Sequence, residues 1–70
     1  MCSLTVNGEQ RQFRNDCFPA TIAELLDRLG VNAATVVAEV EGDIIARERF
    51  AETAISAGQR IELVKFVPGG

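Results

Sequence analysis

The sequence predicts an α+β fold in which a mixed sheet of four or five strands packs on one main α-helix. Three features support this prediction: alternating apolar and polar residues near both ends of the chain, one amphipathic stripe that begins at residue 22, and a length of 70 residues. A chain of this length has room for one small core. We therefore expect a single domain, residues 1–70, with a flexible C-terminal tail at residues 67–70.

Two strands joined by a tight turn are expected at the start of the chain. Residues 2–7 alternate, and their apolar face carries Cys2, Leu4 and Val6. Asn7-Gly8 follows, and both residues tolerate the positive φ of a two-residue hairpin loop. The chain then returns through residues 10–14 as a more polar edge strand whose inward residue is Phe13.

The main helix is predicted to begin at Thr21 and to stop at Gly30. Pro19 prevents an earlier start. Thr21 and Glu24 have the spacing of a capping box, in which the hydroxyl accepts from the Glu24 backbone N–H and the carboxylate reaches back. Gly30 is a typical C-terminal stop. The apolar stripe between them consists of Ile22, Leu25, Leu26 and Leu29.

The middle of the chain predicts a second strand pair and a helical turn. Residues 35–41 alternate, with Val36, Ala38 and Val40 inward and Val37, Glu39 and Glu41 outward. Gly42-Asp43 is predicted to turn the chain into a short strand at residues 44–46. Residues 47–50 are expected to form a helical turn in which Phe50 closes one end of the core. Residues 51–57 are ambiguous, and Ile55 is their only strong apolar anchor.

The final strand is predicted at residues 60–67, after a turn at Ala57-Gly58. Its alternation directs Ile61 and Leu63 toward the helix and leaves Glu62, Val64 and Phe66 on the opposite face. One helix covers only one face of a sheet. Val64 and Phe66 are therefore expected to be exposed, with Val37 beside them, as a partner interface. The alternative is that these are scattered surface residues or are covered by residues 51–57.

The order of these elements restricts the topology. A right-handed crossover places the first strand on one side of the final strand and the third strand on the other. The result is a mixed sheet that holds one helix, which is the β-grasp architecture.

Composition excludes several classes of function. Ten acidic and seven basic residues give a net charge of −3, the wrong sign for binding nucleic acid. Cys2 and Cys17 are too few for a disulfide framework and lack metal-ligand spacing, so two reduced thiols are favoured over one bridge. No signal peptide and no apolar run of membrane-spanning length is present, which predicts a cytoplasmic protein without a membrane partner.

The residues offer little intrinsic chemistry before the chain terminus. The chain contains no His, which removes the usual proton-transfer side chain. Cys17 has only Arg14 near it in sequence to lower its pKa, which favours a structural thiol. No metal cage and no phosphate-binding loop is present, so we expect no bound cofactor, no metal and no catalytic residue. What remains is the Gly70 carboxylate at the end of the tail Pro68-Gly69-Gly70. The glycine pair has no side chains, so it can enter a narrow slot in another protein's active site.

A carboxylate is unreactive toward nucleophiles at neutral pH, so a partner enzyme that uses ATP and Mg²⁺ would have to convert it to an acyl-adenylate. The acyl group could then pass to sulfur, giving a thiocarboxylate, or to an amine, giving an isopeptide. The residues alone leave both routes open.

Several short motifs resemble the bacterial thiamine-pathway sulfur carriers of the ThiS family over nearly the full chain. They are Val6-Asn7-Gly8-Glu9, residues 21–26, residues 37–45 running into Arg47-Glu48-Arg49-Phe50, residues 58–64, and the terminal Gly69-Gly70. The resemblance implies the β-grasp fold of ubiquitin. It also implies that an E1-like (ThiF-like) enzyme adenylates Gly70, that sulfur from a donor protein converts Gly70 to a thiocarboxylate, and that thiazole synthase (ThiG-like) uses this thiocarboxylate as its sulfur source.

Three positions depart from that family pattern: Pro68 in place of a third glycine, Phe50 in place of a common tryptophan, and Ala57 in place of an acidic turn residue. Pro68 brings the chain nearer to the molybdopterin-pathway carriers, the MoaD family, although the early Val-Asn-Gly-Glu fits ThiS better. The alternatives to a thiamine-pathway carrier are a MoaD-like carrier, a ubiquitin-like protein modifier and an interaction module without a reactive terminus.

Overall fold

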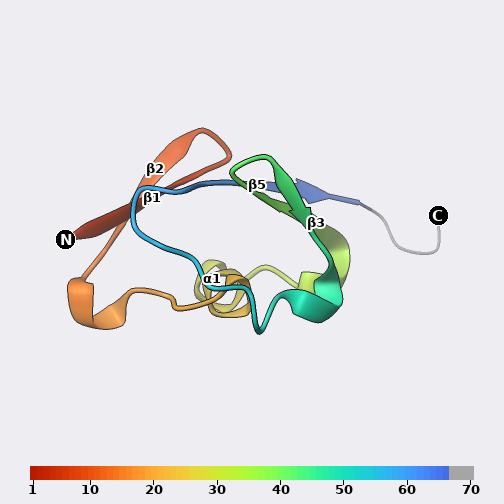
Figure 1. Ribbon diagram of the computed structural model, residues 1–70, viewed down its shortest axis with the longest axis horizontal. Helices are drawn as coiled ribbons and strands as arrows, with labels where there is room; N and C mark the ends of the chain where they lie inside the picture. Colours follow the sequence, from red (N-terminus) through yellow and green to blue (C-terminus); the bar gives the residue numbers. More distant parts are fainter. Residues whose placement is uncertain (67–70) are drawn as a thin grey trace.

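The computed structural model describes residues 1–66 and contains one mixed sheet of five strands. The strands are β1 (Cys2–Val6), β2 (Glu9–Phe13), β3 (Val36–Val40), β4 (Asp43–Ile45) and β5 (Arg60–Lys65), and their order across the sheet is β2-β1-β5-β3-β4. β1 is parallel to β5, and the other neighbours are antiparallel. The helix α1 (Ile22–Leu29) lies against one face of the sheet (Figure 1). This arrangement confirms the predicted α+β fold and its β-grasp topology.

The first hairpin follows directly from its turn residues. Val6 pairs with Glu9, so Asn7 and Gly8 form a two-residue loop, with φ of 52° and 80°. Both values are positive, as a loop of this length requires. Phe13 is the last residue of β2, and its ring packs edge to face against Phe18 with ring centroids 5.8 Å apart. The predicted strands are thus confirmed, with β2 beginning one residue earlier than expected.

Side-chain and backbone caps define both ends of α1. The Thr21 hydroxyl accepts from the Glu24 backbone N–H at 3.2 Å. The Glu24 carboxylate accepts from the backbone N–H of Ala20 at 3.1 Å, one residue before the position that a standard capping box uses. At the other end Gly30 has φ 70° and ψ 29°, and its N–H donates to the Asp27 carbonyl. The left-handed conformation explains why glycine stands there.

The turn between β3 and β4 corrects the predicted boundary by one residue. Val40 pairs with Asp43, so the loop residues are Glu41 and Gly42 rather than Gly42 and Asp43. Glu41 has φ 50°, which is uncommon for a residue with a side chain. Its carboxylate accepts from the backbone N–H of Arg60. That bond ties the turn to β5, and this long-range contact was invisible in the local sequence.

Short 3-10 helices connect the main elements. The predicted helical turn is confirmed as η3 (Arg47–Arg49), whereas η1 (Asn15–Cys17) and η2 (Ala33–Thr35) were not predicted. The ambiguous segment 51–57 is held at the start of α1, because the Ile22 N–H donates to the Thr53 carbonyl and the Ile55 N–H donates to the Ala20 carbonyl, both at 3.1 Å. Ile55 is buried, as expected of its only strong anchor.

The core lies between α1 and the face of the sheet that α1 covers, with Phe50 and Ile55 added from the segment that follows η3. No polar or charged side chain is buried within residues 1–66. Pro19 is fully buried as well, although the sequence treated it only as a helix boundary. The buried apolar side chains are Leu4, Val6, Ile22, Leu25, Leu26, Val36, Ala38, Val40, Phe50, Ile55 and Ile61. Every predicted inward residue of β3 is among them.

β5 lies at the centre of the sheet and leads toward the C-terminal end of the chain (Figure 1). It ends at Lys65 rather than at the predicted residue 67. Phe66 follows the strand, and its N–H donates to the Thr35 carbonyl at 2.9 Å. The predicted tail at residues 67–70 lies outside the described residues. No helix among residues 1–66 is long and apolar enough to cross a membrane.

Candidate functional site

Four exposed apolar side chains gather on the uncovered face of the sheet and at the end of β5. They are Val37 (39% exposed), Ile44 (71%), Val64 (55%) and Phe66 (46%), and we call them the apolar patch. Val37 pairs directly with Val64 across β3 and β5. The structure therefore brings together all three residues predicted for the partner interface, Val37, Val64 and Phe66, and leaves them exposed.

An open hollow of about 410 Å³ lies beside this patch. Val37, Ile44 and Phe66 line it together, along with the start of η3 at Arg47 and Glu48. Apolar side chains that surround a concave surface provide a seat for an apolar side chain of a partner. The hollow lies next to the last described residue, so a protein seated in it would be adjacent to the start of the tail.

Ile44 is the member of the patch that sequence reasoning missed. It lies opposite Glu39 in the β3–β4 register. Val37, two residues before Glu39 on β3, is its diagonal neighbour on the same face. Its neighbour Ile45 points to the other face and packs against the core. Strict alternation along a strand requires that one of two adjacent isoleucines be exposed. The doublet was thus the available signal, but only the register with β3 decides which of the two lies outward.

Two carboxylates continue the uncovered face beyond the patch. Glu39 on β3 is directly opposite Glu62 on β5, and both side chains are half-buried. Neither takes part in an ion pair among residues 1–66, where the salt bridges join Arg14 to Asp16 and Arg49 to Glu52. The uncovered face therefore presents an apolar part and an acidic part side by side.

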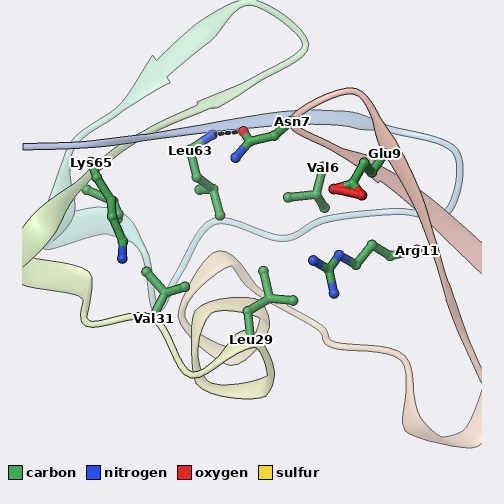
Figure 2. Close-up of a pocket in the computed structure, with 9 residues that line it drawn as sticks. Val6, Asn7, Glu9, Arg11, Leu29, Val31, Leu63 and Lys65 are labelled. Carbon is green, nitrogen blue, oxygen red and sulfur yellow. Dashed lines mark hydrogen bonds between the residues drawn. The ribbon is translucent and has the colours of Figure 1, made fainter.

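A second hollow, of about 210 Å³, lies on the helix side of the sheet. Figure 2 shows Lys65 extending toward Val31, and Arg11 reaching toward Leu29. Long basic side chains commonly cover the edge of a core with their aliphatic stems while their charged ends stay in water. This interpretation accounts for both residues. The Asn7 side-chain oxygen accepts from the Leu63 N–H at 2.7 Å and fixes the first turn above the hollow.

The remaining groups singled out from the sequence are the two thiols, the acidic residues and the tail. No three His, Cys, Asp or Glu side chains gather into a metal-holding group within residues 1–66. Cys2 and Cys17 are both free thiols, and the Cys2 Sγ donates to the Asn15 side-chain oxygen at 3.3 Å. Pro68, Gly69 and Gly70, the predicted reactive tail, lie outside the described residues.

Sequence and structure comparisons identify the family. The model of the ThiS family matches residues 4–70. The chain belongs to the ThiS family. ThiS proteins are carrier proteins of thiamine biosynthesis.

Solved structures of a ThiS protein share the fold closely. A crystal structure of the thiamine biosynthesis protein (ThiS) from Geobacter metallireducens is 33% identical, with a TM-score of 0.81 over 97% of this chain and 99% of that one. An NMR solution structure of a thiamine biosynthesis protein from the same organism gives a TM-score of 0.76 over 97% of this chain and 87% of that one.

A curated relative of greater length also matches. The thiazole synthase of Paramagnetospirillum magneticum is 34% identical over 67 residues, which are 96% of this chain. The chain spans only 20% of that relative's length. A ThiS-like sequence thus occurs within a protein named for thiazole synthesis.

Proposed function

We propose that this chain carries sulfur for thiamine biosynthesis as a thiocarboxylate on Gly70. The observation that carries the proposal is the family match, which extends through residue 70 and so includes Gly69-Gly70. The fold supports it because β5, the central strand, ends at Lys65, five residues before Gly70 in the sequence. Beyond Phe66, four residues can span at most about 14 Å, enough to enter the active site of a docked enzyme.

Activation of the Gly70 carboxylate comes first. A carboxylate oxygen attacks the α-phosphorus of ATP on an E1-like, ThiF-like enzyme, and pyrophosphate leaves. Sulfide-level sulfur from a donor protein then attacks the acyl carbon, the bond between that carbon and the phosphate oxygen breaks, and AMP leaves a thiocarboxylate on Gly70. A donor that holds the sulfur as a persulfide would first give an acyl disulfide, which a second thiol reduces to the thiocarboxylate. ATP and Mg²⁺ belong to the activating enzyme, and this chain contributes the carboxylate and the surface by which it is held.

The apolar patch is the surface that we assign to the activating enzyme. Val64 and Phe66 stand at the end of the strand that leads to the tail, and Val37 and Ile44 extend the same surface across the sheet. An enzyme that binds there holds the chain close to the reacting atom. A few side chains that are fully desolvated at the centre of an interface carry most of its binding energy, and Phe66 is the largest candidate in the patch.

Thiazole synthase, a ThiG-like protein, is the proposed consumer of the sulfur. The support is the match between this chain and a segment of a thiazole synthase. A thiocarboxylate remains ionised at neutral pH and offers a soft sulfur nucleophile. It can therefore attack an electrophilic carbon that the parent carboxylate would leave unchanged.

Two tail variants test whether the reaction occurs at Gly70. Gly70→Val, and a variant with one residue appended after Gly70, should both lose ATP-dependent adenylation by the purified ThiF-like enzyme. Their thermal stability should match that of the parent, because a chain terminus contributes little to folding. The control variant, Cys2→Ser with Cys17→Ser, should be adenylated normally. Normal activation of the extended variant would contradict the proposal.

The fate of the activated chain separates a sulfur carrier from a protein modifier. With a sulfur donor present, the C-terminal peptide should gain the mass difference between sulfur and oxygen. Lysine conjugates of the chain in place of that product would show that the acyl group passes to an amine.

A further inference from the structure

Glu39 and Glu62 form a carboxylate pair that folding alone does not explain. They are directly opposite in the antiparallel register of β3 and β5, on the face that α1 leaves uncovered. Side chains directly opposite in such a register have Cβ atoms about 5 Å apart, and like charges in that position destabilise a sheet. The fold therefore bears a repulsion in the middle of its central strand pair.

No cationic side chain among residues 1–66 forms an ion pair with Glu39 or Glu62. Arg60 is two positions from Glu62 on the same face, yet it forms no ion pair with either carboxylate among the described residues. Arg11 and Lys65 lie at the hollow on the helix side (Figure 2), whereas Glu39 and Glu62 are on the opposite face of the sheet. Arg47 lies at the hollow beside the apolar patch and also makes no ion pair within residues 1–66.

The position of the pair relates it to the apolar patch. On the uncovered face, Val37 pairs with Val64 across β3 and β5. This is the outward-facing pair next to the pair formed by Glu39 and Glu62. Ile44 is opposite Glu39 on the other side. A partner seated on the apolar patch would thus cover the carboxylates as well. An arginine suits this position because its planar fork can donate to two carboxylates and because arginine is enriched at interfaces.

We propose that Glu39 and Glu62 together receive an arginine side chain of the adenylating enzyme, next to the apolar patch. The inference depends on the proposed function, because it assigns the chemistry of the enzyme surface that holds the chain during activation. The pair gives the interface its charge selectivity. An apolar surface without a basic group would leave both carboxylates repelling each other, with water excluded around them.

Neutralising both carboxylates tests the proposal, because stability and binding should change in opposite directions. Glu39→Gln with Glu62→Gln should raise the melting temperature by roughly 2 °C, since the repulsion disappears. The same variant should raise the KM of the chain for ATP-dependent adenylation by the ThiF-like enzyme by about tenfold or more. The turnover number at saturating chain should stay unchanged, because neither residue touches the reacting atoms.

A matched control separates the local pair from net charge. Glu9→Gln with Asp27→Asn removes the same two negative charges from the helix side of the molecule, where both residues are exposed. Its KM should stay within about twofold of the parent, as a small effect of long-range steering. The parent's KM should rise with salt, and that dependence should flatten only in the Glu39 and Glu62 variant.

The outcomes distinguish this inference from the proposed function. If the Glu39 and Glu62 variant has the same KM as the control variant, the pair has no role in docking, although the carrier function would stand. The KM values of the single variants Glu39→Gln and Glu62→Gln can be compared with that of the parent in the same way, with one charge removed in each. If the parent chain is not adenylated at all, the proposed function is wrong and this inference is wrong with it.

Discussion

The two faces of the sheet are made by the same strands and differ in almost every property. The face toward α1 is mainly apolar, and its buried residues lie on β1, β5 and β3. The opposite face is polar over β1, acidic where Glu39 meets Glu62, and apolar at Val37, Ile44 and Val64. Its outward residues include Ser3, Thr5, Val37, Glu39, Ile44, Glu62 and Val64. A sheet with one covered face can assign stability to one side and partner recognition to the other.

The contrast between the two faces shows that exposure, not residue type, distinguishes the apolar patch from the core. Ile61 and Val64 are both aliphatic residues of β5, but Ile61 is fully buried whereas Val64 is 55% exposed. A buried aliphatic side chain stabilises the fold by about 1.5–3 kcal/mol. An exposed one gives little to folding and retains that driving force for a partner. Substitutions on the two faces should therefore separate stability from activation.

Leu26→Ala should have the largest effect on stability. Leu26 is 2% exposed and packs between α1 and the sheet. Its truncation removes buried methyl groups and leaves a cavity, so the free energy of unfolding should fall by about 2–5 kcal/mol. Chemical denaturation of the purified variant measures this. A loss below about 0.5 kcal/mol, typical of surface positions, would place Leu26 outside the core.

Gly30→Ala should have a smaller effect, confined to the end of α1. A Cβ at this position would meet no atom within 4 Å, so the cost is conformational. The left-handed φ of 70° costs a residue with a side chain about 1 kcal/mol. Gly30→Asn should lose less, because asparagine tolerates this conformation. Equal stability of the alanine variant and the parent in thermal melts would indicate that Gly30 does not adopt this conformation.

Local signals explain why most of the fold could be predicted from the sequence. The caps of α1 at Thr21 and Gly30 and the loop Asn7-Gly8 depend on residues a few positions apart, and the structure confirms them. The turn at Glu41-Gly42 was misplaced by one residue because Glu41 is held by Arg60, which is distant in sequence. The burial of Pro19 and the formation of η2 likewise depend on tertiary packing.

The residues of the candidate site likewise divide into those that the local sequence predicted and those that depend on tertiary structure. Val37, Val64 and Phe66 followed from alternation together with the expectation of a single helix. Ile44 and the opposition of Glu39 to Glu62 required the register between strands, which a sequence pattern does not specify. Gly70 was predicted from the family motif and from the scarcity of other chemistry, and it stays a prediction because it lies outside the described residues.

Phe66→Glu should have the smallest effect on stability of these substitutions. Phe66 is 46% exposed and lies beyond the end of β5, so the free energy of unfolding should change by less than about 0.5 kcal/mol. Adenylation by the ThiF-like enzyme should nevertheless fall at least about tenfold in kcat/KM, because a charge replaces an apolar anchor. Phe66→Leu, the matched control, should retain most of the activity. Unfolding of the glutamate variant would show that Phe66 belongs to the core and not to the apolar patch.

Mass spectrometry of the chain purified from its native host tests the carrier function most directly. The proposal predicts a fraction of molecules in which the C-terminal peptide ending in Gly70 is heavier by the difference between sulfur and oxygen. That fraction should disappear from the Gly70→Val variant and should persist when Cys2 and Cys17 are replaced by serine. Sulfur found on Cys2 or Cys17, with the C-terminal peptide unmodified, would contradict the proposal that Gly70 carries it.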